Sequence, residues 1–339
     1  MEPRHSAVDP LDRPGLRVGL CFDRFGDTAP PPGAPPDWDA EYEPEATIVA
    51  LEDALRLLGH TPVRLGNARA LLAALARGPL AVDAAVTIAE SYGSRNREAH
   101  VPVLLELAGV PCLGSDALTL SVSLDKHLTK TVVAAAGVAV PPGVVIPPGA
   151  DARALAADLP FPVMVKPRYE GTAKGIAPSS RVASPQALAA EAARQHRLYA
   201  QDVIAEAFVD GAEFTVGVVG TAGTARALPV LQRAVDPATG IGTHALGDID
   251  GEVVGALTPE LEDALGRAAV AAHRALECRD VSRSDFRVGA DGRPVFVEIN
   301  PLPTFAPDGT FAILAEIEGR PYTAWLADVL AEGFRRLRG

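Results

Sequence analysis

The sequence predicts an α/β protein of more than one domain, and three observations support that fold class. Short apolar runs alternate with amphipathic helical segments through about residue 118, which is typical of β-α-β units around a parallel sheet. Strands and helices of mixed order follow, so the remainder is expected to be α+β. At 339 residues the chain is too long for one ordinary core and suits two or three domains.

The first unit is expected to be a small parallel-sheet domain. Its first strand, residues 16–23, is a short apolar run suited to burial, and a helix over 45–58 has apolar residues at helical spacing. Between them lies a Pro-rich segment, 29–36, which is too stiff and too poor in hydrogen-bond donors for regular structure. The other elements expected here are strands over 62–65, 83–88 and 110–113 and helices over 68–77 and 101–108.

Two further units are expected to follow. The second begins with a helix over 125–136, and the third begins with an alternating strand over 213–219, after a turn at Asp210 and Gly211. The other elements expected are strands over 163–167, 176–182 and 203–208, helices over 185–197, 259–277 and 322–335, and a hairpin over 282–299.

Charge and composition exclude several kinds of partner. The net charge of −12 and the pI near 5.1 argue against nucleic acid or an anionic membrane. The N-terminus has no apolar signal-peptide core, and Pro141 and Pro142 break the longest apolar stretch, so no membrane span is expected. Cys21, Cys112 and Cys278 follow no metal or redox spacing. We therefore expect a cytoplasmic protein that acts on small molecules, and we leave open whether it is a homodimer.

Lysine is rare and clustered. The chain has four lysines against 27 arginines, and all four (Lys126, Lys130, Lys166 and Lys174) lie within one window of 49 residues. Because arginine supplies the general surface charge, a remaining lysine is a candidate functional residue. We interpret Lys126 and Lys166 as functional and leave Lys130 and Lys174 undecided between function and chance clustering.

The hairpin predicts a pair of facing carboxylates. If Asp291 and Gly292 form a two-residue turn, facing residues have numbers that sum to 583. Asp285 then faces Glu298, with their Cβ atoms roughly 4.5–5.5 Å apart. Arg283 likewise faces Asn300, and all four side chains project from one face of the sheet.

The opposite face of the hairpin carries Phe286, Val297 and Ile299, which are expected to be buried. On the polar face, two opposed carboxylates repel unless a cation lies between them, and Asp, Glu and Asn oxygens suit Mg²⁺. The alternative is a solvated hairpin with ordinary surface charge, and a bulge would shift the register.

A glycine loop follows a strand that ends near Lys166. Residues 162–176 read PVMVKPRYEGTAKGI, in which Gly171 and Gly175 bracket Thr172 and Lys174. Such a loop can turn its backbone N–H groups toward phosphate. Glycine-rich turns are common, and this one is neither a Walker A sequence nor a G-x-G-x-x-G fingerprint. The lysine before it and the hairpin after it favour phosphate binding.

Two acidic residues, Glu206 and Glu213, bracket a turn in VIAEAFVDGAEFTVGV. Glu213 starts a strand beside Gly211, where a carboxylate can accept hydrogen bonds from a ribose diol. The alternative is a surface charge at a strand end.

Four motifs in this order resemble the ATP-grasp superfamily, in particular its D-alanine–D-alanine ligase-like branch. They are GVPCLGSDALTLSVSLDKHLTK, FPVMVKPRYEGTAKGI, VIAEAFVDGAEFTVGV and DVSRSDFRVGADGRPVFVEINPLP, and they cover most of the chain from residue 109 to 303. The resemblance implies a three-domain ATP-grasp architecture with an N-terminal parallel-sheet domain. The expected boundaries are 1–15 for a disordered extension, 16–120 for the N-terminal substrate domain, 121–209 for the central subdomain and 210–339 for the C-terminal metal-binding domain.

The resemblance also implies an ATP site. Lys126 and Lys166 correspond to the two lysines that contact ATP phosphates in this family. Residues 206–209 correspond to the hinge that reads adenine, and Glu213 corresponds to the ribose contact. The residues assigned to ATP in this way are Lys126, Lys166, Glu170, Gly171, Glu206, Ala207, Phe208, Val209 and Glu213.

Metal ligands and catalytic residues follow from the same resemblance. Asp285, Glu298 and Asn300 match the family's magnesium ligands, in agreement with the hairpin argument. Arg283 matches the arginine that stabilises the transition state, and Thr172 stands where the family has a serine over the phosphates. The implied cofactors are ATP and two Mg²⁺ ions, with Mn²⁺ as an alternative metal.

The substrate segments depart most from the family pattern. Glu43 corresponds to the residue that holds the first substrate's ammonium group, and Asp308 and Gly309 lie where the family holds the second substrate's carboxylate. The family's mobile loop carries a lysine that is absent here, and we expect Lys174 to replace it as a catalytic residue. Arg95 and Arg97 either grip an acidic substrate side chain or are surface arginines.

The expected activity is therefore ATP-dependent ligation of a carboxylate to an amine through an acyl phosphate. Because the substrate segments differ, we expect a dipeptide or amide of specialised metabolism. The alternatives are a D-alanine–D-alanine ligase of cell-wall synthesis, an ATP-grasp kinase, and a nucleotide-binding regulator without catalysis.

Overall fold

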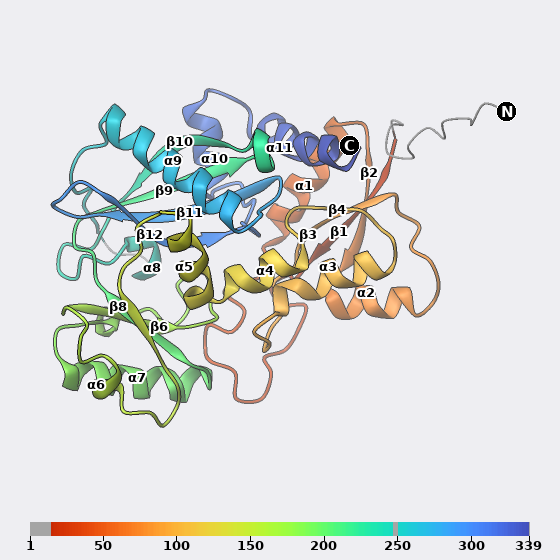
Figure 1. The fold of residues 1–339 in the computed structure, drawn as a ribbon. Coiled ribbons are helices and arrows are strands. Elements are labelled where there is room, and N and C mark those ends of the chain that lie inside the picture. The colour runs from red at the N-terminus through yellow and green to blue at the C-terminus, as the bar shows by residue number, and fades with distance from the viewer. Residues whose placement is uncertain (1–14, 247–249, 339) are drawn as a thin grey trace, which may run out of the picture.

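The computed structural model describes residues 15–246 and 250–338 and contains three four-stranded sheets (Figure 1). The predicted N-terminal extension, apart from Gly15, lies outside the described residues. The mixed α/β fold class is confirmed, with one parallel sheet and two antiparallel sheets.

The N-terminal sheet is parallel, as predicted, with strand order β2-β1-β3-β4. Its strands are β1 (Arg17–Phe22), β2 (Thr61–Gly66), β3 (Ala84–Ile88) and β4 (Cys112–Leu113), and its helices are α1 (Glu45–Leu57), α2 (Ala68–Leu75) and α3 (His100–Leu107). The central strands β1 and β3 are almost wholly buried, as expected for a parallel sheet covered on both faces.

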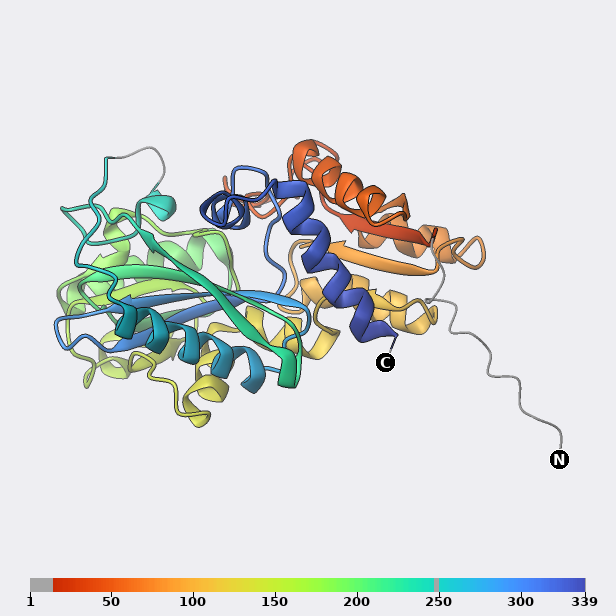
Figure 2. The same ribbon diagram turned by 90° about the horizontal axis from the view of Figure 1, so that it is seen from above.

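The C-terminal helix α11 (Tyr322–Leu337) packs against α1 and β4 of the N-terminal unit (Figure 2). Trp325 and Phe334 of α11 share one core cluster with Leu16, Ile48 and Leu55 of the N-terminal unit. Helix α11 is thus part of the hydrophobic core of the N-terminal unit. The domain boundaries drawn from the sequence stay a prediction.

The central sheet is antiparallel with strand order β5-β8-β6-β7. Its elements are β5 (Gly143–Ile146), α6 (Ala152–Leu155), β6 (Val163–Pro167), β7 (Arg181–Val182), α7 (Pro185–Tyr199) and β8 (Val203–Ala207). The strand expected over 176–182 is wrong for most of its length, because Pro178–Ser180 form a 3₁₀ turn. Pro178 has no N–H to donate to a ladder, and Ser180 Oγ accepts from the Ala177 amide at 3.1 Å.

The C-terminal sheet is antiparallel with strand order β10-β9-β11-β12. Its strands are β9 (Ala212–Val219), β10 (Arg226–Arg233), β11 (Val281–Val288) and β12 (Pro294–Asn300), and the helices around it are α4 (Ala117–Leu124), α5 (Lys126–Ala135), α8 (Thr243–Leu246), α9 (Pro259–Ala275) and α10 (Thr310–Ile317). Sequence analysis missed β10, which contains Pro229 and has an irregular register there. Proline is tolerated because β10 is an edge strand.

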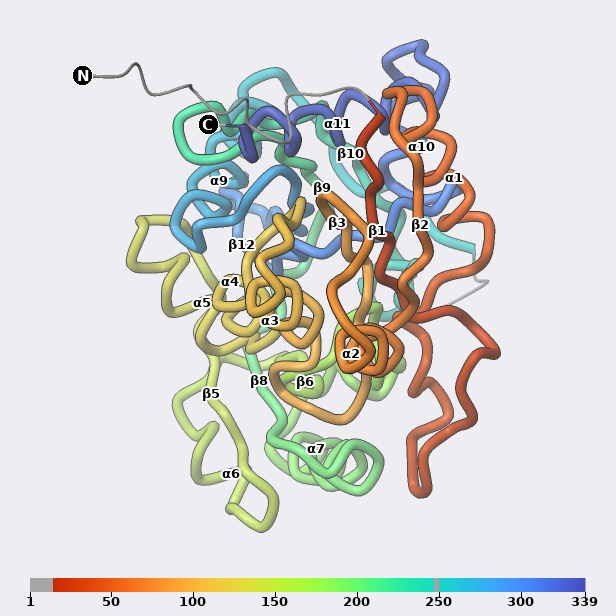
Figure 3. The backbone as a smooth tube through the Cα atoms, turned by 90° about the vertical axis from the view of Figure 1, so that its right-hand side faces the viewer, coloured from red at the N-terminus to blue at the C-terminus, as the bar shows by residue number. Residues whose placement is uncertain are grey.

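A long loop, residues 24–44, leaves the N-terminal sheet and extends alongside α7 of the central unit (Figures 1 and 3). It contains the Pro-rich segment, which has no helix or strand, as predicted. Tyr199 of α7 donates from its hydroxyl to Asp37 at 2.6 Å. Among the described helices, none is long and apolar enough to cross a membrane.

Candidate active site

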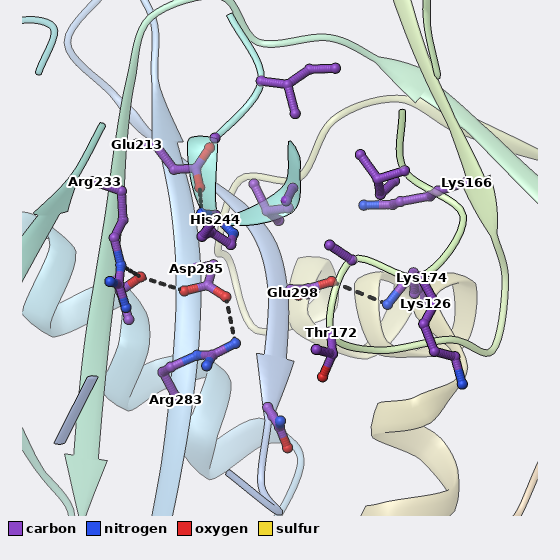
Figure 4. A pocket seen from close by; sticks show the side chains of 18 of the residues that line it. Lys126, Lys166, Thr172, Lys174, Glu213, Arg233, His244, Arg283, Asp285 and Glu298 are labelled. Carbon is purple, nitrogen blue, oxygen red and sulfur yellow. Dashed lines mark hydrogen bonds and ion pairs between the residues drawn. The ribbon is translucent and has the colours of Figure 1, made fainter. Parts of the chain in front are cut away.

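One cavity of about 390 Å³ is lined by residues of all three sheets and their loops (Figure 4). With the exception of Gly171, every site residue predicted from the sequence lines it. These residues are Glu43, Lys126, Lys166, Glu170, Thr172, Lys174, Glu206, Ala207, Phe208, Val209, Glu213, Arg283, Asp285, Glu298, Asn300, Asp308 and Gly309. Residues more than 250 positions apart in the chain are thus brought to one place, and their individual roles remain predictions.

Strands β11 and β12 form the predicted hairpin, although its turn is longer than expected. Residues 289–293 separate the strands, in place of a two-residue turn. Asp285 nevertheless pairs with Glu298, and Arg283 pairs with Asn300, as predicted. The pairing holds because an irregularity just beyond Asp285 shifts the register by one residue and compensates for the longer turn.

The same irregularity makes one prediction wrong. Val297 was expected on the buried face with Phe286 and Ile299, but it is the residue that the register shift leaves without a partner. It lines the cavity, and its carbonyl oxygen accepts a hydrogen bond from Lys130 Nζ at 2.7 Å. Phe286 and Ile299 are buried as predicted.

The two facing carboxylates have positive or hydroxyl partners. Asp285 accepts from Thr215 Oγ1 at 2.7 Å and from Arg283 Nη2 at 3.2 Å. Glu298 accepts from Lys126 Nζ at 3.1 Å. Burial alone would raise the pKa of Glu298, but the charges of Lys126, a second lysine and Arg283 hold it well below its usual range. Glu298 is therefore ionised and able to bind a cation.

The donor atoms of this face fit Mg²⁺. Asp285, Glu298 and Asn300 supply two carboxylates and one amide oxygen. Within the described residues no group of three or more His, Cys, Asp or Glu side chains is placed to hold a metal. A site with so few protein ligands leaves coordination positions for phosphate oxygens, which is how Mg²⁺ is usually held beside nucleotides.

Lys166, the second-last residue of strand β6, forms an ion pair with Glu206 of β8. Its Nζ lies 2.7 Å from one oxygen of Glu206, and Lys130 Nζ lies 3.0 Å from the other. Burial would raise the pKa of Glu206, but the two lysines lower it to about 2. The buried carboxylate of Glu206 therefore positions two lysines, and Lys130, left undecided from the sequence, belongs to the site.

The predicted hinge follows Glu206. The backbone amides of Ala207 and Phe208 donate to the carbonyls of Pro142 and Pro162, each at 2.9 Å. The Phe208 ring lies between two guanidinium groups, with Arg181 at 4.7 Å and Arg287 at 4.9 Å from its centre. These contacts fix the hinge against the start of β6, against β7 and against β11.

Glu213, the predicted ribose contact, is paired with two residues that sequence analysis missed. Its Oε2 lies 2.8 Å from Arg287 Nη1, and its Oε1 lies 3.4 Å from His244 Nδ1. Burial raises the pKa of Glu213. Arg287 was missed because it belongs to the hairpin strand but points toward the β8–β9 connection, where Val209 and Gly211 carbonyls accept from it.

The glycine loop has an unusual backbone. Thr172 and the residue after it are both left-handed, with φ of 46° and 56°, a conformation that costs energy for residues with a side chain. The Gly171 amide donates to Glu41 Oε1 at 2.7 Å, and the Gly175 amide donates to Asp37 at 3.1 Å. A Cβ on Gly171 would lie 2.6 Å from the Glu41 oxygen, so this close approach requires glycine. Two amides expected to face phosphate thus bind carboxylates of the 24–44 loop.

Lys174 has a different environment from the one predicted. Its Nζ lies 2.8 Å from Glu41 Oε2 and also contacts Glu170. Arg97 completes this buried cluster, with Nη2 2.9 Å from Glu41. Two carboxylates already neutralise the Lys174 ammonium, which speaks against the predicted catalytic role. Glu170, predicted at ATP, is bound by Lys174 and by Gln201 at 2.7 Å.

The interpretation of Arg97 as a surface arginine is wrong, whereas its contact with a substrate stays a prediction. Its side chain is 2% exposed and pairs with Glu41 and Glu170. Arg95, in contrast, lies over the ring of Tyr169 at 5.6 Å. Arg97 was misjudged because its partners lie more than 50 residues away in the chain.

The part of the cavity lined by Glu43 and Glu90 is acidic. Glu43 accepts from the Thr304 hydroxyl at 3.0 Å, and burial raises its pKa. Glu90, which sequence analysis did not single out, also lines the cavity. Burial, and to a smaller extent the charges of neighbouring carboxylates, raise the pKa of Glu90 well above its ordinary value. Asp308 is exposed at the rim.

Comparisons with known proteins agree with this geometry. The family described as "D-ala D-ala ligase C-terminus" matches residues 133–331. A D-alanine–D-alanine ligase of Cupriavidus taiwanensis is 34% identical over 71% of this chain and 73% of its own length. The chain belongs to the D-alanine–D-alanine ligase family. An uncharacterised protein of Sinorhizobium fredii is 29% identical over 94% of both chains.

The fold agrees as well. The D-alanine–D-alanine ligase of Bacillus anthracis, solved in complex with ATP, superimposes with a TM-score of 0.71 at 21% identity, covering 96% of this chain and 99% of that one. The resemblance drawn from four motifs is thereby confirmed. As a member of the D-alanine–D-alanine ligase family, the chain is an ATP-grasp ligase that forms a C–N bond and uses ATP and Mg²⁺.

Proposed function

We propose that this enzyme joins the carboxylate of one amino acid to the amino group of a second amino acid or other amine. A carboxylate is a poor acyl donor because its leaving group would be oxide. Attack of a carboxylate oxygen on the γ-phosphorus of ATP breaks the bond to the β-phosphate oxygen and gives an acyl phosphate and ADP. The amine then attacks the acyl carbon, phosphate leaves, and the amine loses a proton.

One observation carries the proposal: Asp285, Glu298 and Arg283 share a cavity with Lys126 and Lys166 (Figure 4). Anionic ligands for Mg²⁺ therefore lie beside cations able to bind phosphate, as phosphoryl transfer requires. Arg283 Nε is buried and has no hydrogen-bond partner among the described residues. That unsatisfied donor supports a role for Arg283 in binding the anionic intermediate of acyl transfer.

The remaining roles follow the family resemblance, and the residues concerned all line the cavity. Residues 207–209 would contact adenine and Glu213 the ribose, and Thr172 in the strained glycine loop would lie over the phosphates. Asp285, Glu298 and Asn300 would hold Mg²⁺, which neutralises phosphate charge during the transfer. Glu43, on the acidic side of the cavity, would bind the ammonium group of the first amino acid.

A second candidate is synthesis of D-alanyl-D-alanine itself, which the names of the relatives favour. Against this, the segment 303–309 lacks the family's usual residues around the second substrate. We therefore favour a different dipeptide or amide, made in specialised metabolism. The cytoplasmic location and a homodimer also stay predictions.

The test is a screen of ADP release over pairs of amino acids of both chiralities and simple amines, with products identified by mass. We expect ADP release that requires both partners and a product equal to their sum minus water. ADP release with D-alanine as the sole substrate, giving its dipeptide faster than any other pair, would favour the second candidate. ADP release at the same rate with and without every amine tested would overturn the ligase proposal.

A further inference from the structure

Arg233, the last residue of β10, differs from the other cationic residues of the cavity. The five other lysines and arginines that line it each have a carboxylate partner within the described structure, and they are Lys126, Lys166, Lys174, Arg283 and Arg287. Arg233 has none within 4.0 Å among the described residues. Its partners are two hydroxyls: Nε donates to Thr215 Oγ1 at 3.2 Å, and Nη2 donates to Thr310 Oγ1.

The charge of Arg233 is compensated only indirectly, because the Thr215 hydroxyl stands between it and the Asp285 carboxylate. Hydroxyls satisfy two of the five N–H donors of a guanidinium but do not compensate its charge. Burial of Arg233 lowers its pKa, and the more distant charges of Asp285 and Glu213 oppose that shift only in part. A half-buried arginine that touches no carboxylate within the described part of the chain is therefore suited to a planar oxyanion, which it can bind through two parallel hydrogen bonds.

The position of Arg233 indicates which anion. Figure 4 shows Arg233 across Asp285 from Lys126 and Lys166, on the side away from the proposed phosphate site. Its partner Thr310 is the first residue of α10, which follows directly on the segment 303–309. The start of α10 has no side-chain cap, so its free amides add positive potential at the same place.

We propose that Arg233 and Thr310 bind a second carboxylate on the amine substrate, so that the enzyme selects an acidic amino acid as acceptor. This inference rests on the proposed function. Arg283 remains assigned to the anionic intermediate, and Arg233 adds a separate positive group. The ligand class is an amino dicarboxylic acid of the aspartate or glutamate type, of either chirality.

The test compares acids with their neutral isosteres. In the full-length enzyme, kcat/KM is measured for aspartate against asparagine and for glutamate against glutamine as acceptors, with the best donor from the screen. A charge-assisted contact predicts that the wild type favours the acid by about tenfold to hundredfold. In Arg233→Met the preference disappears, mainly through KM for the acid, and Arg233→Lys restores part of it. Arg267→Met, which removes an exposed arginine of α9, is the matched control.

Two outcomes would overturn the inference. One is a wild type that uses acid and amide equally well. The other is an Arg233→Met variant, folded by its melting temperature, in which KM for ATP rises while the acid-to-amide ratio is unchanged, because Arg233 would then contact the nucleotide. If no pair of substrates releases ADP, the proposed function fails but Arg233 is still testable. Calorimetry of glutamate and glutamine binding to the ADP complex then shows whether Arg233→Met selectively loses glutamate.

Discussion

Lys174 Nζ lies 2.8 Å from Glu41 Oε2, although 133 residues separate the two in the chain. Both side chains are almost completely buried, at 1% and 4% exposure. Arg97 and Glu170 complete a cluster of two cations and two carboxylates. The cluster ties the 24–44 loop to the glycine loop and to the segment after β3, so it determines where the glycine loop lies.

Breaking this cluster should destabilise the fold. Lys174→Met leaves Glu41 and Glu170 sharing one arginine, and we expect the free energy of unfolding to fall by about 3–5 kcal/mol, as for other buried pairs that lose one partner. Urea denaturation measures it. The double variant Glu41→Gln/Lys174→Met should lose less than the sum of the two single variants. A Lys174→Met enzyme with native stability but no turnover would instead support the catalytic role predicted from the sequence.

Glu298→Gln should separate metal binding from folding. Loss of a residue that hydrogen-bonds to a metal ligand commonly weakens metal affinity by about 10–100-fold. Loss of a direct ligand should weaken it at least as much. We expect turnover to fall steeply, and the Mg²⁺ concentration that gives half of the residual activity to rise. The circular dichroism spectrum should stay unchanged. Glu260→Gln, at an exposed position of α9, is the control. Turnover equal to the wild type would remove Glu298 from the metal site.

Glu206→Gln should leave two lysines buried side by side without their shared carboxylate. Lys130 already has its pKa lowered by burial to about 8, and Glu206 opposes that shift. Without Glu206 we expect lower stability and a higher KM for ATP, since Lys166 is no longer held. Adding Lys130→Met removes one of the repelling charges and should recover stability in thermal melting. A double variant less stable than Glu206→Gln alone would contradict this account of the charge balance.

Stability should also depend on His273 at mildly acidic pH. His273 is fully buried, with Nδ1 2.7 Å from Ser282 Oγ and Nε2 3.1 Å from the Gly220 carbonyl. Burial lowers its pKa from 6.5 to about 4. As the pH falls, the unfolded chain binds the proton first, so stability is complete above pH 6.5 and declines toward pH 4.

The expected loss from this one group is roughly 3 kcal/mol across that interval. Because carboxylates also titrate there, the useful quantity is the difference between the wild type and His273→Gln in urea denaturation at each pH. We expect the difference to shrink as the pH falls from 6.5 to 4. A difference independent of pH would show that His273 titrates normally in the folded protein.

Much of the site was predictable because its geometry is local. Alternation with period two, the turn at residues 289–293 and the bulge at Val297 together bring Asp285 opposite Glu298; the turn is longer than predicted, and the bulge was considered only as an alternative. The four lysines were identified from composition, and three of them, Lys126, Lys130 and Lys166, contact the carboxylates of the site. Most helices and strands followed from hydrophobic spacing, whereas the edge strand β10 was missed because Pro229 interrupts its pattern.

By itself, the sequence determined the order of most elements, the facing carboxylates and the family, since these depend on spacings of a few residues. Only the tertiary structure decided that Lys174 is neutralised by Glu41, that Arg97 is buried, and that Arg233 contacts no carboxylate among residues 15–246 and 250–338. The physical reason is that the effect of a buried charge depends on its counter-ion. The counter-ion of Arg97 lies 56 residues away in the chain, and that of Lys126 lies 172 residues away. Local sequence patterns cannot predict contacts over such separations.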